Sequence, residues 1–220
     1  MNKTSSPEHS ENTKKKKRVR LTPEIRRKQI LDAALIEFSS LGYTAASISK
    51  IAQRAEMSKA NLYVHFANKE EIFETLLTHV LVPPTDQASW IDNSSENNLT
   101  QLIDHFIDQS YDSLTPHSIA VIRLLISESH RIPHLIHKWY AEFIIPFRNS
   151  QNAAINKLVD EGKIYKNPFT EGLSFSMAPI LYAAVVHMFF PKDMAEIEFH
   201  KIKETHRKIL HLLLTPKALS

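Results

Sequence analysis

Apolar residues recur every three or four positions over most of the chain, which is the periodicity of amphipathic helices. We expect the first helix to begin at Thr22-Pro23-Glu24, with threonine as the N-cap and proline at the first helical position. Gly42 stands where a left-handed C-cap would end this helix. Its predicted apolar face is Leu31, Ala34, Leu35, Phe38 and Leu41.

Three shorter helices are predicted next. Ser47 and Ser58 are the expected N-caps of two of them, with a break at Glu56-Met57 between the two. Asn68 and Glu71 are the expected capping box of the third, which ends before a Pro-Pro pair. The second helix of the chain carries one apolar face, formed by Ile48, Ile51, Ala52 and Ala55.

The polar stretch that follows is rich in Ser, Asn and Asp and is predicted to be a linker, 83–98. Five longer helices are expected beyond it, at about 99–114, 116–132, 134–160, 168–190 and 193–214. Pro146 and Pro179 are expected to kink or divide the third and fourth of these, and Asp193 to cap the last. The pattern predicts an all-α fold of about nine helices, divided into an arm (1–21), a small domain (22–82), the linker and a larger helical domain (99–220).

The composition excludes several functions. The 220 residues include three glycines and no cysteine, so no phosphate-cradling glycine loop, disulfide or Cys-ligated metal site can form. His130, His134 and His137 have helical spacing, but Pro133 interrupts the helix and no carboxylate pair completes a metal site. Because GxSxG and HExxH motifs are also missing, we expect no enzyme activity, no cofactor and no metal.

We expect no secretion signal, and the most apolar stretch, 177–191, is too short to span a bilayer. Positive charge is concentrated at one end, because residues 1–28 hold ten Lys and Arg against three Glu, while the whole chain has a net charge of +3. A basic arm of this kind is typical of nucleic-acid binding or of a solvated tail. The larger remainder of the chain is therefore acidic.

The two short helices around 47–66 form a helix-turn-helix candidate, although an ordinary pair of antiparallel helices has the same spacing. The N-terminal residues of a recognition helix reach base edges in the major groove. Here these are Ser58, Lys59, Ala60 and Asn61, of which Asn61 has the amide that reads adenine. Tyr63, His65 and Lys69 are spaced to reach phosphates, while Leu62 and Phe66 are expected to pack inward.

The stretch IAQRAEMSKANLYVHFANKEEIFETLL, with FSSLGY before it, resembles the DNA-binding region of the TetR/AcrR family of transcriptional repressors. The resemblance covers about residues 22–80, and LYxHF followed by xNKEE is its most specific part. A fainter likeness to the AefR-like subgroup lies in RLLISESHRIPHLIHKWYAEFI. The family usually has Gly where this chain has Glu56, so a positive φ at this position would be strained.

The resemblance implies a bacterial, cytoplasmic homodimer that binds a palindromic DNA operator and releases it when a small molecule binds. Carried over position by position, the operator contacts are Ser47, Ser58, Lys59, Ala60, Asn61, Tyr63, His65 and Lys69. A hydrophobic or aromatic effector is expected between the helices of the larger domain. Its candidate binding residues are His105, Tyr111, Arg123, Trp139, Phe143 and His187, although aromatic residues at helical spacing are also typical of plain core.

The family places its dimer interface on the last two long helices, and this chain fits. The segment 177–190 is apolar nearly all round, and the last helix has a heptad-like seam. The expected interface residues are Met177, Phe189, Phe199, Ile202, His206, Ile209 and Leu213. We expect His206, the titratable residue of the seam, to weaken the dimer when it is protonated.

Two other functions agree with the same sequence. The chain could coat DNA without sequence preference through its basic arm, or it could be a helical small-molecule-binding protein without a DNA role. A one-component, ligand-responsive repressor is the leading hypothesis.

Overall fold

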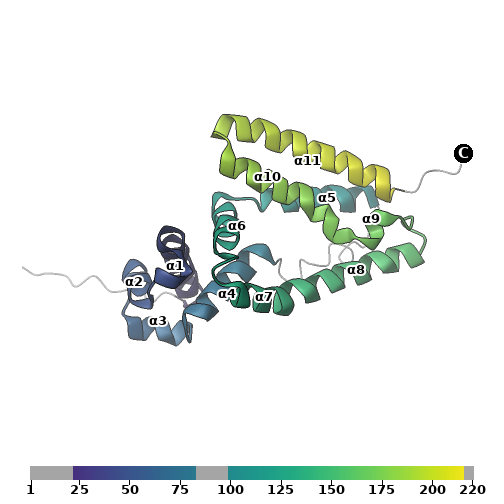
Figure 1. Ribbon diagram of the computed structural model, residues 1–220. Coiled ribbons are helices and arrows are strands. Elements are labelled where there is room, and N and C mark those ends of the chain that lie inside the picture. Colours follow the sequence, from purple (N-terminus) through teal and green to yellow (C-terminus); the bar gives the residue numbers. More distant parts are fainter. Residues whose placement is uncertain (1–21, 83–98, 216–220) are drawn as a thin grey trace, which may run out of the picture.

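The computed structural model describes residues 22–82 and 99–215 and is all-helical over these residues (Figure 1). The predicted arm and linker, 1–21 and 83–98, lie outside the described residues. The N-terminal elements are α1 (Pro23–Ala45), α2 (Ile48–Arg54), α3 (Lys59–His65) and α4 (Lys69–Leu81). The later ones are α5 (Leu99–Asp112), α6 (Pro116–Glu128), α7 (Pro133–Trp139), a π-helical turn η1 (Tyr140–Ile144), α8 (Ile145–Asp160), α9 (Pro168–Glu171), a 3₁₀ turn η2 (Leu173–Met177), α10 (Ala178–Phe189) and α11 (Lys192–Leu214).

The two internal prolines divide their helices as expected. Pro146 lies in the first turn of α8, and the π-helical turn η1 directly precedes it. Pro179 likewise lies in the first turn of α10, after the 3₁₀ turn η2. The predicted helices at 134–160 and 168–190 are therefore each broken into shorter pieces.

Side-chain caps begin all four N-terminal helices. Thr22, Ser47, Ser58 and Asn68 each accept a hydrogen bond from a backbone N–H in the first turn of the helix that follows. The reciprocal half of the capping box is displaced by one residue, since the Glu71 carboxylate accepts from the Ala67 N–H at 2.6 Å. The expected cap by Asp193 is wrong, because Asp193 lies inside the first turn of α11 and Pro191 holds the N-cap position.

The end of α1 differs from the expected left-handed cap. Gly42 has φ 76° and ψ 162°, so its φ is positive but its ψ is extended, and the helix resumes beyond this kink to Ala45. Leu41, which the periodicity placed on the apolar face, is exposed. The kink turns the last residues of α1 away from the line of the helix and toward α2.

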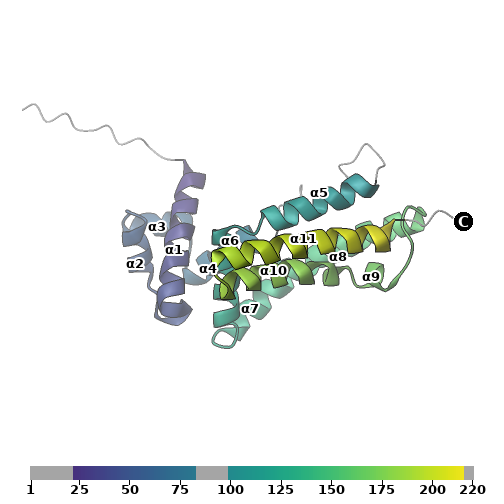
Figure 2. The ribbon, with the colours of Figure 1, turned by 90° about the horizontal axis from the view of Figure 1, so that it is seen from above.

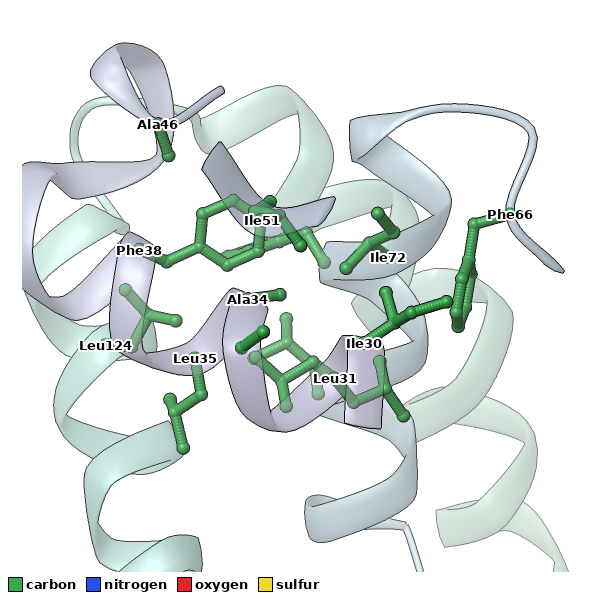
Figure 3. Close-up of a cluster of buried hydrophobic side chains, with 14 of the residues drawn as sticks. Ile30, Leu31, Ala34, Leu35, Phe38, Ala46, Ile51, Phe66, Ile72 and Leu124 are labelled. Carbon is green, nitrogen blue, oxygen red and sulfur yellow. The ribbon is translucent and has the colours of Figure 1, made fainter. Parts of the chain in front are cut away.

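The apolar interior consists of two clusters. The first joins α1, α2, α3 and α4 to residues of α6 and α7, and it includes Phe73 and Trp139. Figure 3 shows part of this cluster, with Phe38, Phe66 and Leu124. The second lies among α5, α8, α10 and α11. The core of the N-terminal helices is thus completed by helices from beyond the predicted linker.

Figures 1 and 2 show α1, α2 and α3 at one end of the molecule and α5, α8, α9, α10 and α11 at the other, with α4, α6 and α7 between them. Helices α10 and α11 run side by side in both views. Among the described residues, no helix combines the length and apolarity needed to cross a membrane.

Candidate DNA-binding surface and ligand cavity

Helix α3 has one buried and one exposed face. Leu62 and Phe66 are buried in the first core, as predicted, and hold the helix against α1 and α2. The N-terminal end of the helix and its outward side are exposed, and they carry Ser58, Lys59, Ala60, Asn61 and Tyr63. Ser58 also caps the helix, since its Oγ accepts from the Asn61 N–H at 3.1 Å. Five of the eight predicted operator contacts therefore lie together on one accessible surface.

One residue of this surface was not singled out from the sequence. Val64 follows Tyr63 on α3 and is 78% exposed, which is unusual for an apolar side chain on a helix of this core. An apolar side chain on a recognition helix can contact the methyl group of thymine. The sequence signal that could have identified Val64 is its position between the tyrosine and the histidine of the LYVHF motif.

Arg27 of α1 fixes the C-terminal end of α3. Its guanidinium donates a hydrogen bond to the carbonyl oxygen of His65 and lies 4.1 Å from the centre of the Phe66 ring. His65 itself is half-buried, and so is Ser47, whose Oγ accepts from the Lys50 N–H as the cap of α2. These contacts set the direction in which the exposed face of α3 points.

The turn between α2 and α3 has Glu56 in a left-handed conformation, with φ 54°, the one positive φ of a non-glycine residue in the described segments. The Met57 N–H donates to the Ala52 carbonyl at 3.0 Å and the Glu56 N–H to the Gln53 carbonyl at 3.1 Å. This pair of bonds is a Schellman motif, whose left-handed position is usually Gly. The expected turn is therefore kept despite the glutamate.

Lys69 is placed differently from the phosphate contact that we expected. Its ammonium donates to the carbonyls of Tyr43, Thr44 and Ala46, at 2.7, 3.2 and 3.0 Å. Burial lowers the pKa of this amine. The side chain ties the start of α4 to the end of α1, so a phosphate would have to compete with three backbone acceptors.

A cavity of about 260 Å³ lies in the other half of the molecule. Residues of α4, α5, η1, α8, η2 and α11 line it: Leu81, Ile103, Phe106, Tyr140, Ile144, Phe147, Arg148, Gln151, Asn152, Ser176, Met177, Leu210 and Leu214. A pocket among these helices was expected, but none of the six predicted effector-binding residues lines this one.

Those six residues have other surroundings. Tyr111 and Trp139 are buried and satisfied within the protein, since the Tyr111 hydroxyl lies 3.2 Å from His206 Nδ1 and the Trp139 indole donates to Thr78 Oγ1 at 3.0 Å. Phe143 packs on the first core, and the His187 ring lies 5.2 Å from that of Phe199. His105 and Arg123 are exposed. The helical spacing of Tyr111, Trp139 and Phe143 is thus explained by packing in the core, as is usual for aromatic residues at this spacing.

The dimer prediction also needs correction at particular residues. Phe199, Ile202 and His206 face the second core and not a free surface, and His206 is only 2% exposed. Met177 is 44% exposed and also lines the cavity. Phe189, Ile209 and Leu213 are exposed as expected, and they share the outer face of α10 and α11 with five apolar residues that the heptad assignment missed: Leu181, Tyr182, Met194, Ile197 and Leu212. The apolar face exists, but it is rotated from the predicted seam.

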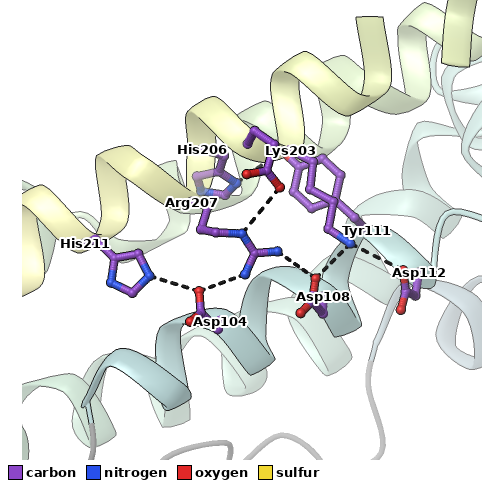
Figure 4. A network of polar contacts seen from close by, with 9 residues as sticks. Asp104, Asp108, Tyr111, Asp112, Lys203, His206, Arg207 and His211 are labelled. Carbon is purple, nitrogen blue, oxygen red and sulfur yellow. Dashed lines mark hydrogen bonds and ion pairs between the residues drawn. The ribbon is translucent and has the colours of Figure 1, made fainter. Parts of the chain in front are cut away.

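A charged ladder joins α5 to α11 (Figure 4). Asp104 and Asp108 of α5 accept from the two terminal nitrogens of Arg207, each at 2.7 Å. Lys203 and His211 extend the ladder, at 2.8 Å from Asp108 and 2.9 Å from Asp104. The contact with His211 lowers the pKa of Asp104, and that with Lys203 lowers the pKa of Asp108. This ladder holds α5 over the cavity, to which both helices contribute apolar side chains.

His130, His134 and His137 do not share one helical face, because His130 lies in the turn before α7. Over residues 22–82 and 99–215 no three His, Asp or Glu side chains are placed to hold a metal ion.

Residues 30–76 match the family described as bacterial regulatory proteins, tetR family. The transcriptional regulator YhgD of Bacillus subtilis is 39% identical over 56 residues, 26% of this chain and 29% of that protein. YdeS, a regulator from the same organism, is 26% identical over 77% of this chain and 83% of its own length. The chain thus aligns with less than a third of the length of YhgD and with most of YdeS.

Solved structures share the fold over nearly the whole chain. NalD, the secondary repressor of the MexAB-OprM multidrug efflux pump in Pseudomonas aeruginosa, matches with a TM-score of 0.63 and 16% identity. The match covers 90% of this chain and all of that structure. At this identity the likeness supports the arrangement of the helices.

Proposed function

We propose that this chain is a TetR-family helix-turn-helix transcriptional repressor that binds a palindromic operator as a homodimer and releases it when a small molecule enters the cavity. The exposed face of α3 carries the proposal. It presents an amide, an ammonium and small side chains at the N-terminal end of a helix whose opposite face is buried. Helices of this kind read base edges in the major groove.

Within this surface we assign different roles to different residues. Asn61 reads a base, and Lys59, at the edge of the same face, contacts a base or a phosphate. Tyr63 and His65 contact phosphates, together with Ser47 and Ser58 at the two caps. Repression needs only that the dimer occupy the promoter, whereas activation would need a further surface for RNA polymerase.

The exposed apolar face of α10 and α11 is the proposed dimer interface. Leu181, Phe189, Ile197 and Leu212 are all more than half exposed, and an apolar surface of this kind is rarely left open on a monomer. A two-fold axis through this face would place two copies of α3 on one operator, because a palindromic site requires two-fold symmetry.

Helix α4 connects the two sites in this proposal. Leu81, near its C-terminal end, lines the cavity and also packs on the first core, as does Ile144 of η1. Lys69, at its N-terminal end, holds the last carbonyls of α1, beyond which α2 begins. A ligand that displaces Leu81 therefore shifts a helix that is bonded to the DNA-binding unit, and this shift favours a conformer with wrongly spaced recognition helices.

Binding of the full-length protein to DNA from upstream of its own gene tests the proposal. In a gel-shift assay we expect a complex that survives excess competitor DNA and that Asn61→Ala weakens by about 1–3 kcal/mol. Tyr63→Phe should weaken the specific complex and the competitor complex alike. Loss of the complex to competitor would indicate DNA coating through the basic arm, and no binding at low salt would indicate a ligand-binding protein without a DNA role.

A further inference from the structure

The cavity wall is chemically two-sided. Residues from α4, α5 and α11 contribute only apolar side chains: Leu81, Ile103, Phe106, Leu210 and Leu214. The polar side chains come from η1, α8 and η2: Tyr140, Arg148, Gln151, Asn152 and Ser176. A ligand that fills this cavity therefore has an apolar body and one polar end.

Arg148 is the charged residue of this wall. Its guanidinium donates to the hydroxyl of Tyr140 at 3.2 Å, which is a neutral partner. No acidic residue belongs to the described cavity lining, and no ion pair of the described segments includes Arg148. A guanidinium beside apolar surface binds carboxylates through charge-assisted hydrogen bonds and disfavours cations. The polar end of the ligand is thus an anion.

Asn152 lies one helical turn after Arg148, on the same face of α8. Its buried Oδ1 has no hydrogen-bond partner within the described parts of the chain. A buried acceptor without a donor costs free energy, which a ligand O–H or N–H near the anionic group would recover. The cavity volume of about 260 Å³ lies just below the usual range of roughly 300–1,000 Å³ for ligand pockets, so the ligand is small.

We propose that the effector is a small amphipathic carboxylic acid with a hydroxyl or N–H group close to its carboxylate. The carboxylate binds Arg148 and Tyr140, the donor group binds Asn152, and the chain or ring lies against the apolar wall. This inference rests on the proposed role of the cavity as the effector site, and it specifies which chemistry that site selects.

Calorimetric titration of the full-length, DNA-free protein with ten-carbon probes tests the head group. The probes are decanoate, 3-hydroxydecanoate, 1-decanol and decylamine, which share one body. We expect decanoate to bind roughly 10- to 100-fold more tightly than decanol or decylamine, because one charge-assisted hydrogen bond increases affinity by about this factor. The added hydroxyl of 3-hydroxydecanoate should improve binding further. Equal or tighter binding of decanol or decylamine, or no binding of either acid, overturns the proposal.

Variants locate the contact. Arg148→Gln should reduce decanoate binding to the level of decanol while leaving decanol binding unchanged, and Asn152→Leu should remove only the gain from the 3-hydroxyl group. Arg123→Gln is the matched control, because it removes an exposed guanidinium from α6 that does not line the cavity. An equal loss for decanol and decanoate in Arg148→Gln would mean a general packing effect and would refute the assignment. Tyr140→Phe, which keeps the ring, gives a second test of the same contact.

The operator gel shift without any ligand is measured separately. A protein that binds its operator but none of the acids refutes this inference alone. A protein that binds decanoate through Arg148 but no DNA refutes the proposed repressor function and leaves the ligand class supported.

Discussion

The carboxylate of Glu128, which is 1% exposed near the end of α6, accepts a hydrogen bond from the backbone N–H of Tyr43 in α1 at 3.1 Å. Its other oxygen pairs with Arg131 at 3.0 Å. The bond falls directly after the kink at Gly42, so a helix from beyond residues 83–98 holds the bend that leads into α2. Glu128 thus joins α6 to the end of α1, next to the helices that are proposed to bind DNA.

This relationship makes Gly42 sensitive to substitution. A Cβ at Gly42 would lie 3.1 Å from Glu128 Oε1 and 3.3 Å from Arg131 Nη1, in a backbone conformation that side chains rarely adopt. We expect Gly42→Ala to lower the free energy of unfolding by about 1–3 kcal/mol in urea denaturation. Gly172→Ala is the control, since its φ is negative and its nearest contact would be an ordinary 3.6 Å. Similar losses in both variants would argue against a special role of the kink.

Glu56 and Gly162 occupy equivalent positions in two Schellman motifs, with φ 54° and 69°. Glu56→Gly should raise stability by up to about 1 kcal/mol, because glycine adopts this conformation without a steric penalty. The reverse change, Gly162→Glu, should destabilise by a similar amount, since a Cβ there would meet nothing within 4 Å and the cost is confined to the backbone. Melting temperatures measured by calorimetry test whether Glu56→Gly is stabilising and Gly162→Glu destabilising. A clearly lower melting temperature for Glu56→Gly would refute the proposed backbone strain at Glu56.

The buried His206 makes stability depend on pH. Burial lowers the pKa of His206 to about 4 from a usual 6.5, so the unfolded chain binds a proton that the folded chain does not. The free energy of unfolding is therefore not reduced by this histidine above pH 6.5. It falls as the pH drops from 6.5 toward 4, by about 2–3 kcal/mol for this residue. His206→Gln should flatten this part of the profile in denaturation experiments at several pH values.

The control for that series is His105→Gln, which removes an exposed histidine from α5. The expected pH effect concerns the fold of one subunit, because the Tyr111–His206 bond is internal to it. A dimer dissociation constant that changed with pH in the native protein but not in His206→Gln would restore the original interface assignment.

Lys69 and Lys59 form a second matched pair. Lys69→Met leaves three carbonyls at the end of α1 without their donor, and we expect a stability loss of about 1–2 kcal/mol. Lys59→Met removes an exposed cation and should weaken DNA binding with little change in stability. Thermal melts and gel shifts on both variants separate the two roles. Unchanged stability in Lys69→Met would return this lysine to the set of phosphate contacts.

The apolar face of α10 and α11 is tested by Phe189→Asp, which places a charge on its most exposed side chain, 78% accessible in one chain. Sedimentation velocity should show the native protein as a dimer and the variant as largely monomeric, since an unpaired charge is costly in an interface. Ile126→Asp, at an exposed apolar residue of α6, should leave the dimer intact. A native monomer at micromolar concentration would refute the interface.

Local signals predicted the helix starts well. Thr22, Ser47, Ser58 and Asn68 act within one turn of their own position, so their capping roles depend little on the rest of the fold. The inward positions of Leu62 and Phe66 were predictable for the same reason, since a short amphipathic helix has one apolar face.

The errors arose where two sides of a helix are both apolar, or where residues distant in the sequence determine what a side chain contacts. On α11 the residues Phe199 and Ile209 are both apolar, and the positions of α5 and α10 determine which one is covered. Lys69 resembled a phosphate contact because the three carbonyls that bind it come from 23 to 26 residues earlier in the chain. The cavity depends on six elements at once, which no periodicity reveals.

The ladder between α5 and α11 repeats every four residues on both helices, with Asp104, Asp108 and Asp112 facing Lys203, Arg207 and His211. A slide of α5 along α11 by one helical turn, about 5.4 Å, would bring each carboxylate opposite the next base and re-form most of the pairs. The charges therefore hold the helices together without selecting an alignment. Tyr111 and His206 have Ile107 and Leu210 as their neighbours one turn away, so such a slide would break their buried hydrogen bond, and this bond favours the present alignment.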